Sequence, residues 1–100
     1  MNTERDKFLT EVMGECWHEW KEDLDEYTNY TCIKCNKQYF IPYNNNFSTW
    51  EGFGKLLEWS QGQEWWIMEF MPKYDKYAFM RLISNPDRFA DDVYNYLKEK

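Results

Sequence analysis

Several features that define common protein classes are missing from this chain of 100 residues. No apolar run approaches the roughly 20 residues that a membrane-spanning helix needs, and the N-terminus, MNTERDKF, lacks the apolar core of a secretion signal. There is no Gly-rich phosphate loop, no G-x-S-x-G elbow and no H-E-x-x-H pair. We therefore expect a non-enzymatic protein of the cytosol, where thiols stay reduced and clustered cysteines favour a metal over a disulfide.

Basic charge is also scarce. The chain has 12 Lys and Arg against 18 Asp and Glu, a net charge of −6, and residues 1–30 hold the whole acidic excess. No basic stripe is present that would release counterions from phosphates, so direct nucleic-acid binding is not expected. The acidic segment is either a solvated face that keeps the protein soluble or a surface that docks on a basic partner or mimics nucleic acid. The carboxylates considered for docking are Glu19, Glu22, Asp23 and Asp25.

Aromatic residues, in contrast, are abundant, with 6 Trp, 8 Tyr and 7 Phe. Each buries roughly 150–250 Å², so even one domain covering residues 1–100 can build a substantial core. A domain of this size cannot hide all of them, and an exposed aromatic patch usually marks a contact site. We expect core packing for some and contact roles for others among Trp17, Trp20, Trp65, Trp66 and Tyr74.

Capping residues and apolar periodicity predict three helices, over residues 3–14, 46–61 and 85–100. Thr3, Ser48 and Asn85 are the expected N-caps, Pro86 suits a first helical turn, and Gly62 ends the second helix. Residues 38–43 (QYFIPY) are typical of a short strand. Residues 64–71 and 77–84 are rich in aromatic and branched side chains and predict an antiparallel hairpin, with a helix over 64–71 as the rival interpretation.

These elements predict an α+β fold in which a small antiparallel sheet is packed between helices, as in an α-β-α sandwich. Between the first and second helices lies an inserted region, residues 15–46, that contains all three cysteines and the only histidine. We call residues 15–46 the knuckle region.

Two closely spaced pairs in the knuckle region predict a metal site: Cys16-x-His18 and Cys32-x-x-Cys35. Zinc prefers four tetrahedral nitrogen and sulfur ligands, and a C-x-x-C turn supplies two thiolates. A site with four protein ligands has no open position for water, so the predicted zinc is structural. Two alternatives stay open at this stage. Cys16 and His18 can belong to the first helix and never meet the second pair, or the cysteines can serve redox chemistry, for which no thioredoxin-like context is present.

Four segments together resemble a family of small bacteriophage and prophage proteins similar to the phage ABA sandwich domain family. They are DKFLTEVMGECWHEW, the C-x-x-C that follows, NFSTWEGFGKLLEWSQGQEWW and NPDRFADDVYNYLKEK. The resemblance implies helices on both faces of a small sheet and a virus-encoded accessory protein in the cytoplasm of a host bacterium. It carries no established activity, so no residue inherits a catalytic role from it.

Two functional hypotheses follow, besides a structural role in the virion. The first is an accessory protein that binds and inhibits a host protein of anti-phage defence through acidic and aromatic side chains. The second is a sponge for a small nucleotide signal of host immunity, which would stack a base on Trp65 or Trp66 and hold phosphate with Lys55, Arg81 or Arg88.

Overall fold

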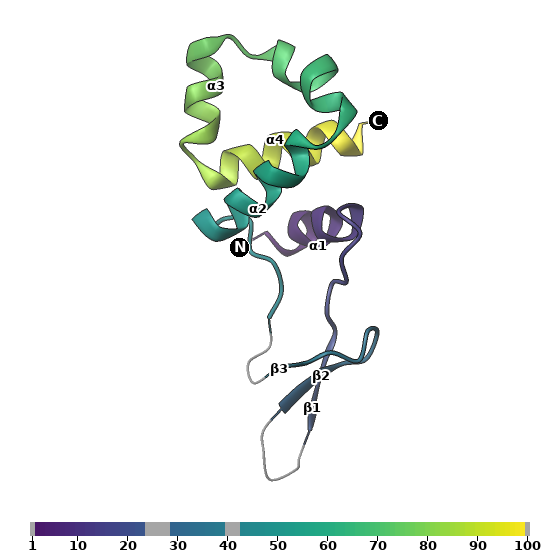
Figure 1. The fold of residues 1–100 in the computed structure, drawn as a ribbon. Helices are drawn as coiled ribbons and strands as arrows, with labels where there is room; N and C mark the ends of the chain where they lie inside the picture. The colour runs from purple at the N-terminus through teal and green to yellow at the C-terminus, as the bar shows by residue number, and fades with distance from the viewer. Residues whose placement is uncertain (1, 24–28, 40–42, 100) are drawn as a thin grey trace.

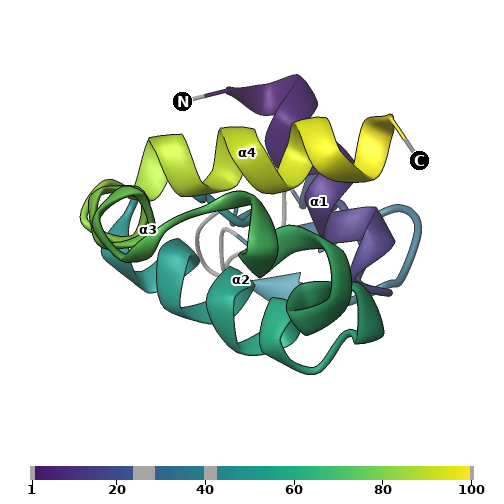
Figure 2. The same ribbon diagram turned by 90° about the horizontal axis from the view of Figure 1, so that it is seen from above.

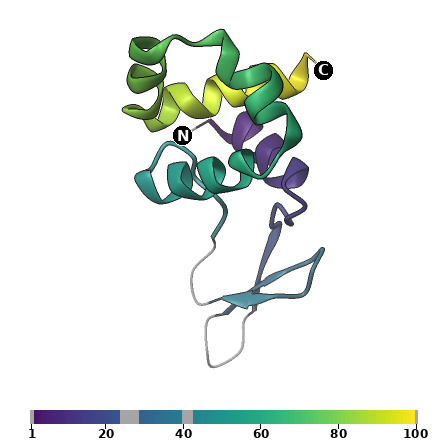
Figure 3. The same cartoon turned by 45° about the horizontal axis from the view of Figure 1, so that its top comes forward.

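A computed structural model of the chain describes residues 2–23, 29–39 and 43–99. The molecule is elongated, with principal extents of 55 × 24 × 20 Å. In the part of the chain that the structure describes, the helices gather at one end and the β-strands lie at the other (Figures 1 and 3). We call the helical end the helical body.

The helical body is built around its last helix. In chain order it contains α1 (Thr3–Val12), α2 (Trp50–Gln61), a π-helical turn η1 (Trp66–Phe70), a 3-10 turn η2 (Met71–Lys73), α3 (Lys76–Ile83) and α4 (Pro86–Lys98). Helix α4 contacts α1, α2 and α3, and in the view from above it crosses α1 (Figure 2). Phe89 and Val93, one helical turn apart on α4, are fully buried. The rest of the core is Leu9, Phe47, Leu56, Trp65, Trp66, Phe70, Leu82 and Ala90.

The helix ends follow the expected chemistry, with a shift of one residue at two of them. Asn85 caps α4 and Pro86 occupies its first turn, as predicted. Asn2, and not Thr3, caps α1, since its side chain accepts a hydrogen bond from the backbone of Arg5. Likewise Thr49, and not Ser48, caps α2. The Ser48 hydroxyl instead donates a hydrogen bond to the Asp87 carboxylate of α4.

The predicted hairpin over 64–71 and 77–84 is wrong, because both segments are helical. The composition of these segments is typical of strands, yet the side chains that they bury recur at helical spacing. Trp66 and Phe70 stack with ring centroids 5.2 Å apart and face the core. Asp75 caps α3 by accepting a hydrogen bond from the backbone of Ala78 at 2.7 Å. The rival interpretation, a helix over 64–71, is therefore the one observed, in π-helical form.

The sheet comes from the knuckle region instead. It is antiparallel with the order β1 (Trp20–Asp23), β2 (Asn29–Cys32) and β3 (Gln38–Tyr39). Trp20 pairs with Cys32 in the first ladder, and Tyr30 pairs with Tyr39 in the second. The α+β class is confirmed, but the sheet does not lie between helices, so the expected sandwich is not the arrangement observed (Figure 1). The predicted strand over 38–43 is seen at 38–39, and residues 40–42 lie outside the described part.

A buried arginine joins three parts of the helical body. The Arg5 side chain of α1 is only 2% exposed. Its guanidinium donates to Asp91 at 2.7 Å, to Asp87 at 3.2 Å and to the neighbouring Asp6 at 3.0 Å. It also donates to Ser48, which precedes α2, at 3.1 Å. Buried charges are tolerated only when paired in this way, so the cluster ties α1 to α4 and to the start of α2.

Two glycines of α2 offer a matched test of how closely the chain packs. A Cβ atom on Gly52 would lie 2.1 Å from the carbonyl oxygen of Asn46, whereas one on Gly54 would meet nothing within 4 Å. We expect Gly52→Ala to destabilise the protein because the backbone at Asn46 must move. Gly54→Ala should instead stabilise it by up to about 1 kcal/mol through helix propensity. Urea unfolding of both variants checks this, and a gain in stability for Gly52→Ala would contradict the close approach.

Two tyrosines predict loss of stability at high pH. The Tyr74 hydroxyl donates to Asp92 at 2.7 Å and the Tyr96 hydroxyl donates to Glu69. Burial, followed by the bond to Asp92, raises the pKa of Tyr74, and burial with the bond to Glu69 raises the pKa of Tyr96 to about 12. Because the fold favours the neutral phenols, their contribution is complete below pH about 10 and is lost as the pH rises through these raised values.

The urea midpoint should therefore fall between pH 9 and pH 12, measured by circular dichroism. The variant Tyr74→Phe/Tyr96→Phe should show a smaller fall than the unmodified protein. Equal falls in the two proteins would contradict the assignment.

Among the described residues, no helix combines the length and the apolar character needed to cross a bilayer.

Candidate metal centre

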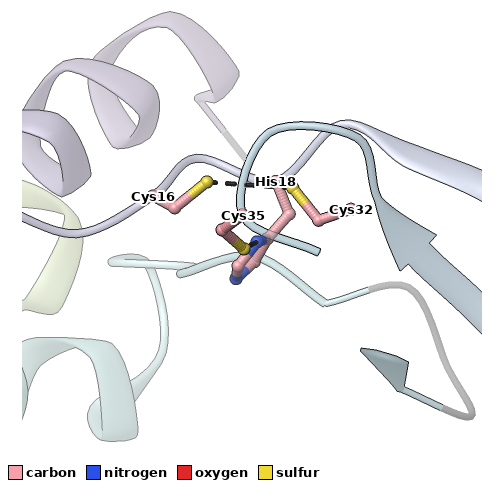
Figure 4. A group of neighbouring side chains, drawn as sticks. All are labelled: Cys16, His18, Cys32 and Cys35. Atoms are coloured by element: carbon pink, nitrogen blue, oxygen red, sulfur yellow. Dashed lines mark hydrogen bonds between the residues drawn. The ribbon is translucent and has the colours of Figure 1, made fainter. Parts of the chain in front are cut away.

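The four predicted ligands converge on one point of the knuckle region (Figure 4). Their donor atoms, three sulfur atoms and one imidazole nitrogen, all lie within 4.8 Å of one another. The Sγ atoms of Cys16 and Cys32 are 3.8 Å apart, and Cys35 Sγ lies 3.4 Å from His18 Nδ1. The alternative in which Cys16 and His18 belong to the first helix is wrong, since α1 ends at Val12. The group could hold a metal ion.

The second pair is presented by a tight turn. Cys32 is the last residue of β2, and a turn over residues 33–35 carries Cys35 back beside it. Asn36 closes the turn with φ of 63°, a left-handed conformation that asparagine tolerates, and its backbone donates to the Cys32 carbonyl at 2.9 Å. The backbone N–H of Lys34 points at Cys32 Sγ, 3.4 Å away. This arrangement suits a thiolate, which accepts hydrogen bonds.

The first pair sits on irregular chain between α1 and β1. Gly14, with φ of 80°, turns the chain out of α1. The backbone of Ile33 then donates to the Glu19 carbonyl at 3.0 Å, which aligns residues 16–19 with the turn that bears Cys35. The side-chain amide of Asn44 binds the backbone of His18 on both sides. It accepts a hydrogen bond from the His18 N–H at 2.7 Å and donates one to the His18 carbonyl at 3.0 Å.

Aromatic rings surround His18. The Trp20 ring centroid lies 4.7 Å from the imidazole and the Tyr39 centroid 5.9 Å from it. Trp20 also donates its indole N–H to the Tyr43 carbonyl at 3.1 Å. These contacts limit the orientations of the imidazole and hold Nδ1 toward the sulfur atoms.

Two of the six separations between donor atoms match a tetrahedral centre. Zinc–sulfur bonds of about 2.3 Å separate two tetrahedral ligand sulfurs by about 3.8 Å, and a sulfur from an imidazole nitrogen by about 3.6 Å. The observed separations are 3.8 Å between Cys16 and Cys32 and 3.4 Å between Cys35 and His18. A disulfide requires sulfur atoms about 2.05 Å apart, and all three cysteines are free.

The cysteines differ in acidity before any metal is considered. Burial by itself would raise the pKa of Cys32, but the backbone N–H groups of Cys35 and Lys34 and the His18 side chain together lower it to about 5. Burial, followed by hydrogen bonds to Cys32 and Cys35, raises the pKa of Cys16 to about 11. The protein therefore supplies one preformed thiolate, and a cation among the sulfurs would favour ionisation of the others.

The other predicted contact residues are divided between core and surface. Trp17, Trp65 and Trp66 are buried, with exposed fractions of 9%, 8% and 4%, which leaves each of them little surface for a partner. Trp65 and Trp66 belong to the core of the helical body. Trp20 and Tyr74 are half-buried. Trp20 packs on the metal centre, whereas Tyr74 binds Asp92 of α4.

The predicted acidic surface is only partly described. Glu19 is exposed and pairs with Lys34 at 3.2 Å. Glu22 and Asp23 belong to β1, and their side chains, like all of Asp25, lie outside the described part.

The residues expected to bind a nucleotide do not come together. Lys55 on α2 pairs with Glu15 at 2.5 Å. Arg81 and Arg88 are exposed on α3 and α4. Since Trp65 and Trp66 are buried, neither offers a face on which a base could stack.

Two supporting residues escaped sequence analysis. No role was predicted for Asn44 or Arg5, yet Asn44 binds the backbone of His18 on both sides and Arg5 joins α1 to α4. Comparison with protein-family models, curated proteins and solved structures finds no match. The resemblance to small phage proteins therefore stays a prediction, and the site must be interpreted from its own geometry.

Proposed function

We propose that this chain is a non-enzymatic protein-binding module in which Cys16, His18, Cys32 and Cys35 hold a structural Zn²⁺. The observation that carries the proposal is the set of four donor atoms within 4.8 Å of one another, two of whose separations match a tetrahedral ion. Three thiolates and an imidazole favour zinc over hard cations such as Mg²⁺ or Ca²⁺, which prefer oxygen ligands. Four protein ligands fill the coordination sphere, so the ion has no position from which to activate water.

The role of zinc in this proposal is to shape the knuckle region. The β-sheet is small and stands away from the helical body (Figure 1). Sheets of this size have little hydrophobic core of their own and depend on a cross-link such as a bound metal. The ion would join the irregular chain after α1 to the turn after β2 and so fix the direction in which the hairpin projects.

Binding to another protein is supported by the surface of the helical body. Large apolar side chains are exposed at Ile67, Met68, Tyr77 and Met80, besides Trp50 on α2. Aromatic residues and methionine are enriched at protein interfaces, where they supply contact area. Trp and Tyr also dominate binding hot spots.

We further propose, on the resemblance to small phage proteins, that the chain acts in the cytoplasm of a host bacterium by inhibiting a protein of anti-phage defence. The nucleotide-sponge hypothesis is not carried forward, because its stacking residues are buried and its cations lie on three different helices.

Native mass spectrometry of the protein, expressed in a phage-sensitive bacterium and purified without chelator, tests the proposal. We expect the mass of one chain plus one zinc ion, together with a stoichiometric complex with a host protein. A chain that carries no metal would overturn the zinc assignment. A zinc-loaded chain with a nucleotide-sized adduct and no protein partner would overturn the protein-binding role in favour of the sponge.

A further inference from the structure

A cleft of about 750 Å³ lies where the end of the knuckle region passes over α2. One wall is the irregular segment 43–46, and the other is the face of α2 that carries Trp50, Glu51, Lys55 and Glu58. We propose that this cleft binds a cationic side chain, arginine or lysine, in a polypeptide segment of the partner protein. The inference rests on the proposed protein-binding function and adds to it the site and the chemistry of the partner.

The wall formed by segment 43–46 is tied to the metal centre. Asn44 holds the backbone of His18, one of the four ligands, through hydrogen bonds of 2.7 and 3.0 Å. The adjoining Asn45 is buried and donates to Thr10 of α1 at 3.1 Å. These hydrogen bonds hold the wall to the knuckle region on one side and to the helical body on the other.

The charges lining the cleft are unbalanced. Glu51 and Glu58 are exposed on α2 and form no ion pair with any residue that the structure describes. The cation between them, Lys55, is already neutralised by Glu15 at 2.5 Å and bonded to Asn45 at 3.0 Å. The free charge that faces a ligand is thus negative and complementary to a cation.

Helix stability accounts for only one of the two carboxylates. Glu51 is in the first turn of α2, where the helix dipole favours a negative charge. Glu58 is in the last turn, which contains no basic residue and where the dipole disfavours a carboxylate. A negative charge at this position opposes the stability of the helix, which is consistent with a role in binding.

Aromatic side chains complete the chemistry of a cation site. Trp50 is 61% exposed and Tyr43 is 47% exposed, and both line the cleft. Trp50 is held in place by an edge-on contact with Phe53, with the ring centroids 5.3 Å apart. A guanidinium or ammonium group that rests on the face of such a ring is attracted to it, more strongly for Trp than for Tyr or Phe. Aromatic faces together with carboxylates select a cation and reject a phosphate.

The backbone of the wall favours a polypeptide over a small free cation. Within the described ranges, the N–H and C=O groups of Asn44 and Asn45 bond to no other residue. An incoming chain that pairs its cation with Glu51 or Glu58 can bond its own backbone to the groups of the half-buried Asn44.

The test uses the zinc-loaded full chain and an octapeptide of alternating glycine and arginine, followed by amide NMR spectroscopy. A glycine–glutamine octapeptide is the uncharged control. We expect shift changes concentrated in residues 43–46 and 50–58. We expect affinity to fall about tenfold in Glu51→Gln/Glu58→Gln and about fivefold in Trp50→Ala. The matched control Glu4→Gln/Glu64→Gln, which changes net charge equally outside the cleft, should stay within about twofold.

An equal loss in the matched control, or shift changes centred elsewhere, would overturn the inference and show that the peptide senses only net charge. Equal binding of the glutamine peptide would also overturn it. If Glu51→Gln/Glu58→Gln loses the arginine peptide but still forms the host complex in native mass spectrometry, the cleft is not the partner site and the inference fails while the proposed function stands. If the peptide binds as expected but no host complex is found, the cation site stands and the proposed function fails.

Discussion

The double variant Cys32→Ser/Cys35→Ser is expected to lose bound zinc and much of its thermal stability. Serine removes two of the three sulfur ligands, and one of them, Cys32, is fully buried at the end of β2. Binding of structural zinc by small fingers contributes about 10–16 kcal/mol at neutral pH, much of which is folding free energy. We expect the knuckle region to depend on the proposed ion more than the helical body does, because the main hydrophobic core lies in the helical body.

Zinc content by plasma emission spectroscopy and melting by circular dichroism measure this effect. Chelator should lower the melting temperature of the unmodified protein and leave that of the variant unchanged. The control is Ile33→Ser, which places the same polar residue in the same turn at an exposed position that is not a ligand. It should retain one zinc ion per chain. Unchanged melting of the double variant would defeat the structural role of the ion.

The substitution Arg5→Met is expected to destabilise the helical body by about 3–5 kcal/mol, the range found when one partner of a buried ion pair is removed. Among the residues that the structure describes, it leaves the fully buried carboxylate of Asp6 with one hydrogen bond, which the backbone N–H of Phe47 donates at 3.3 Å. It also removes the link from α1 to Asp87 and Asp91 of α4. Arg81→Met, an exposed change of the same chemistry, should stay within about 0.5 kcal/mol.

The same variant has a predicted dependence on pH. Burial raises the pKa of Asp6, and the Arg5 guanidinium opposes that rise. Removing Arg5 should raise the pKa of Asp6 further, so that the folded variant takes up a proton more readily than the unfolded chain. Its deficit relative to the unmodified protein should therefore shrink as the pH falls through the raised value. Urea unfolding between pH 4 and pH 8 measures the deficit, and a deficit that grows in acid would contradict the role of Asp6.

The candidate metal ligands could be predicted from the sequence because their arrangement is local. A C-x-x-C turn brings two thiols together within four residues, and a C-x-H pair on irregular chain presents two donors to one side. The spacing of Cys16, His18, Cys32 and Cys35 therefore predicted a group that the fold brings within 4.8 Å. The last helix could be predicted for a similar reason, since Asn85 and Pro86 define its start through local capping and backbone preferences.

Only the tertiary structure decided the state of residues 64–84. The same aromatic side chains suit a strand face or a helix face, and local propensity favoured the strand. Packing of Trp66, Phe70 and Leu82 into one core with α4 determined the outcome, because helical spacing buries all three side chains. The burial of Arg5 and the cleft beside α2 depend in the same way on contacts between segments far apart in the chain. No spacing within a single segment could predict them, since their partners come from other helices and from the end of the knuckle region.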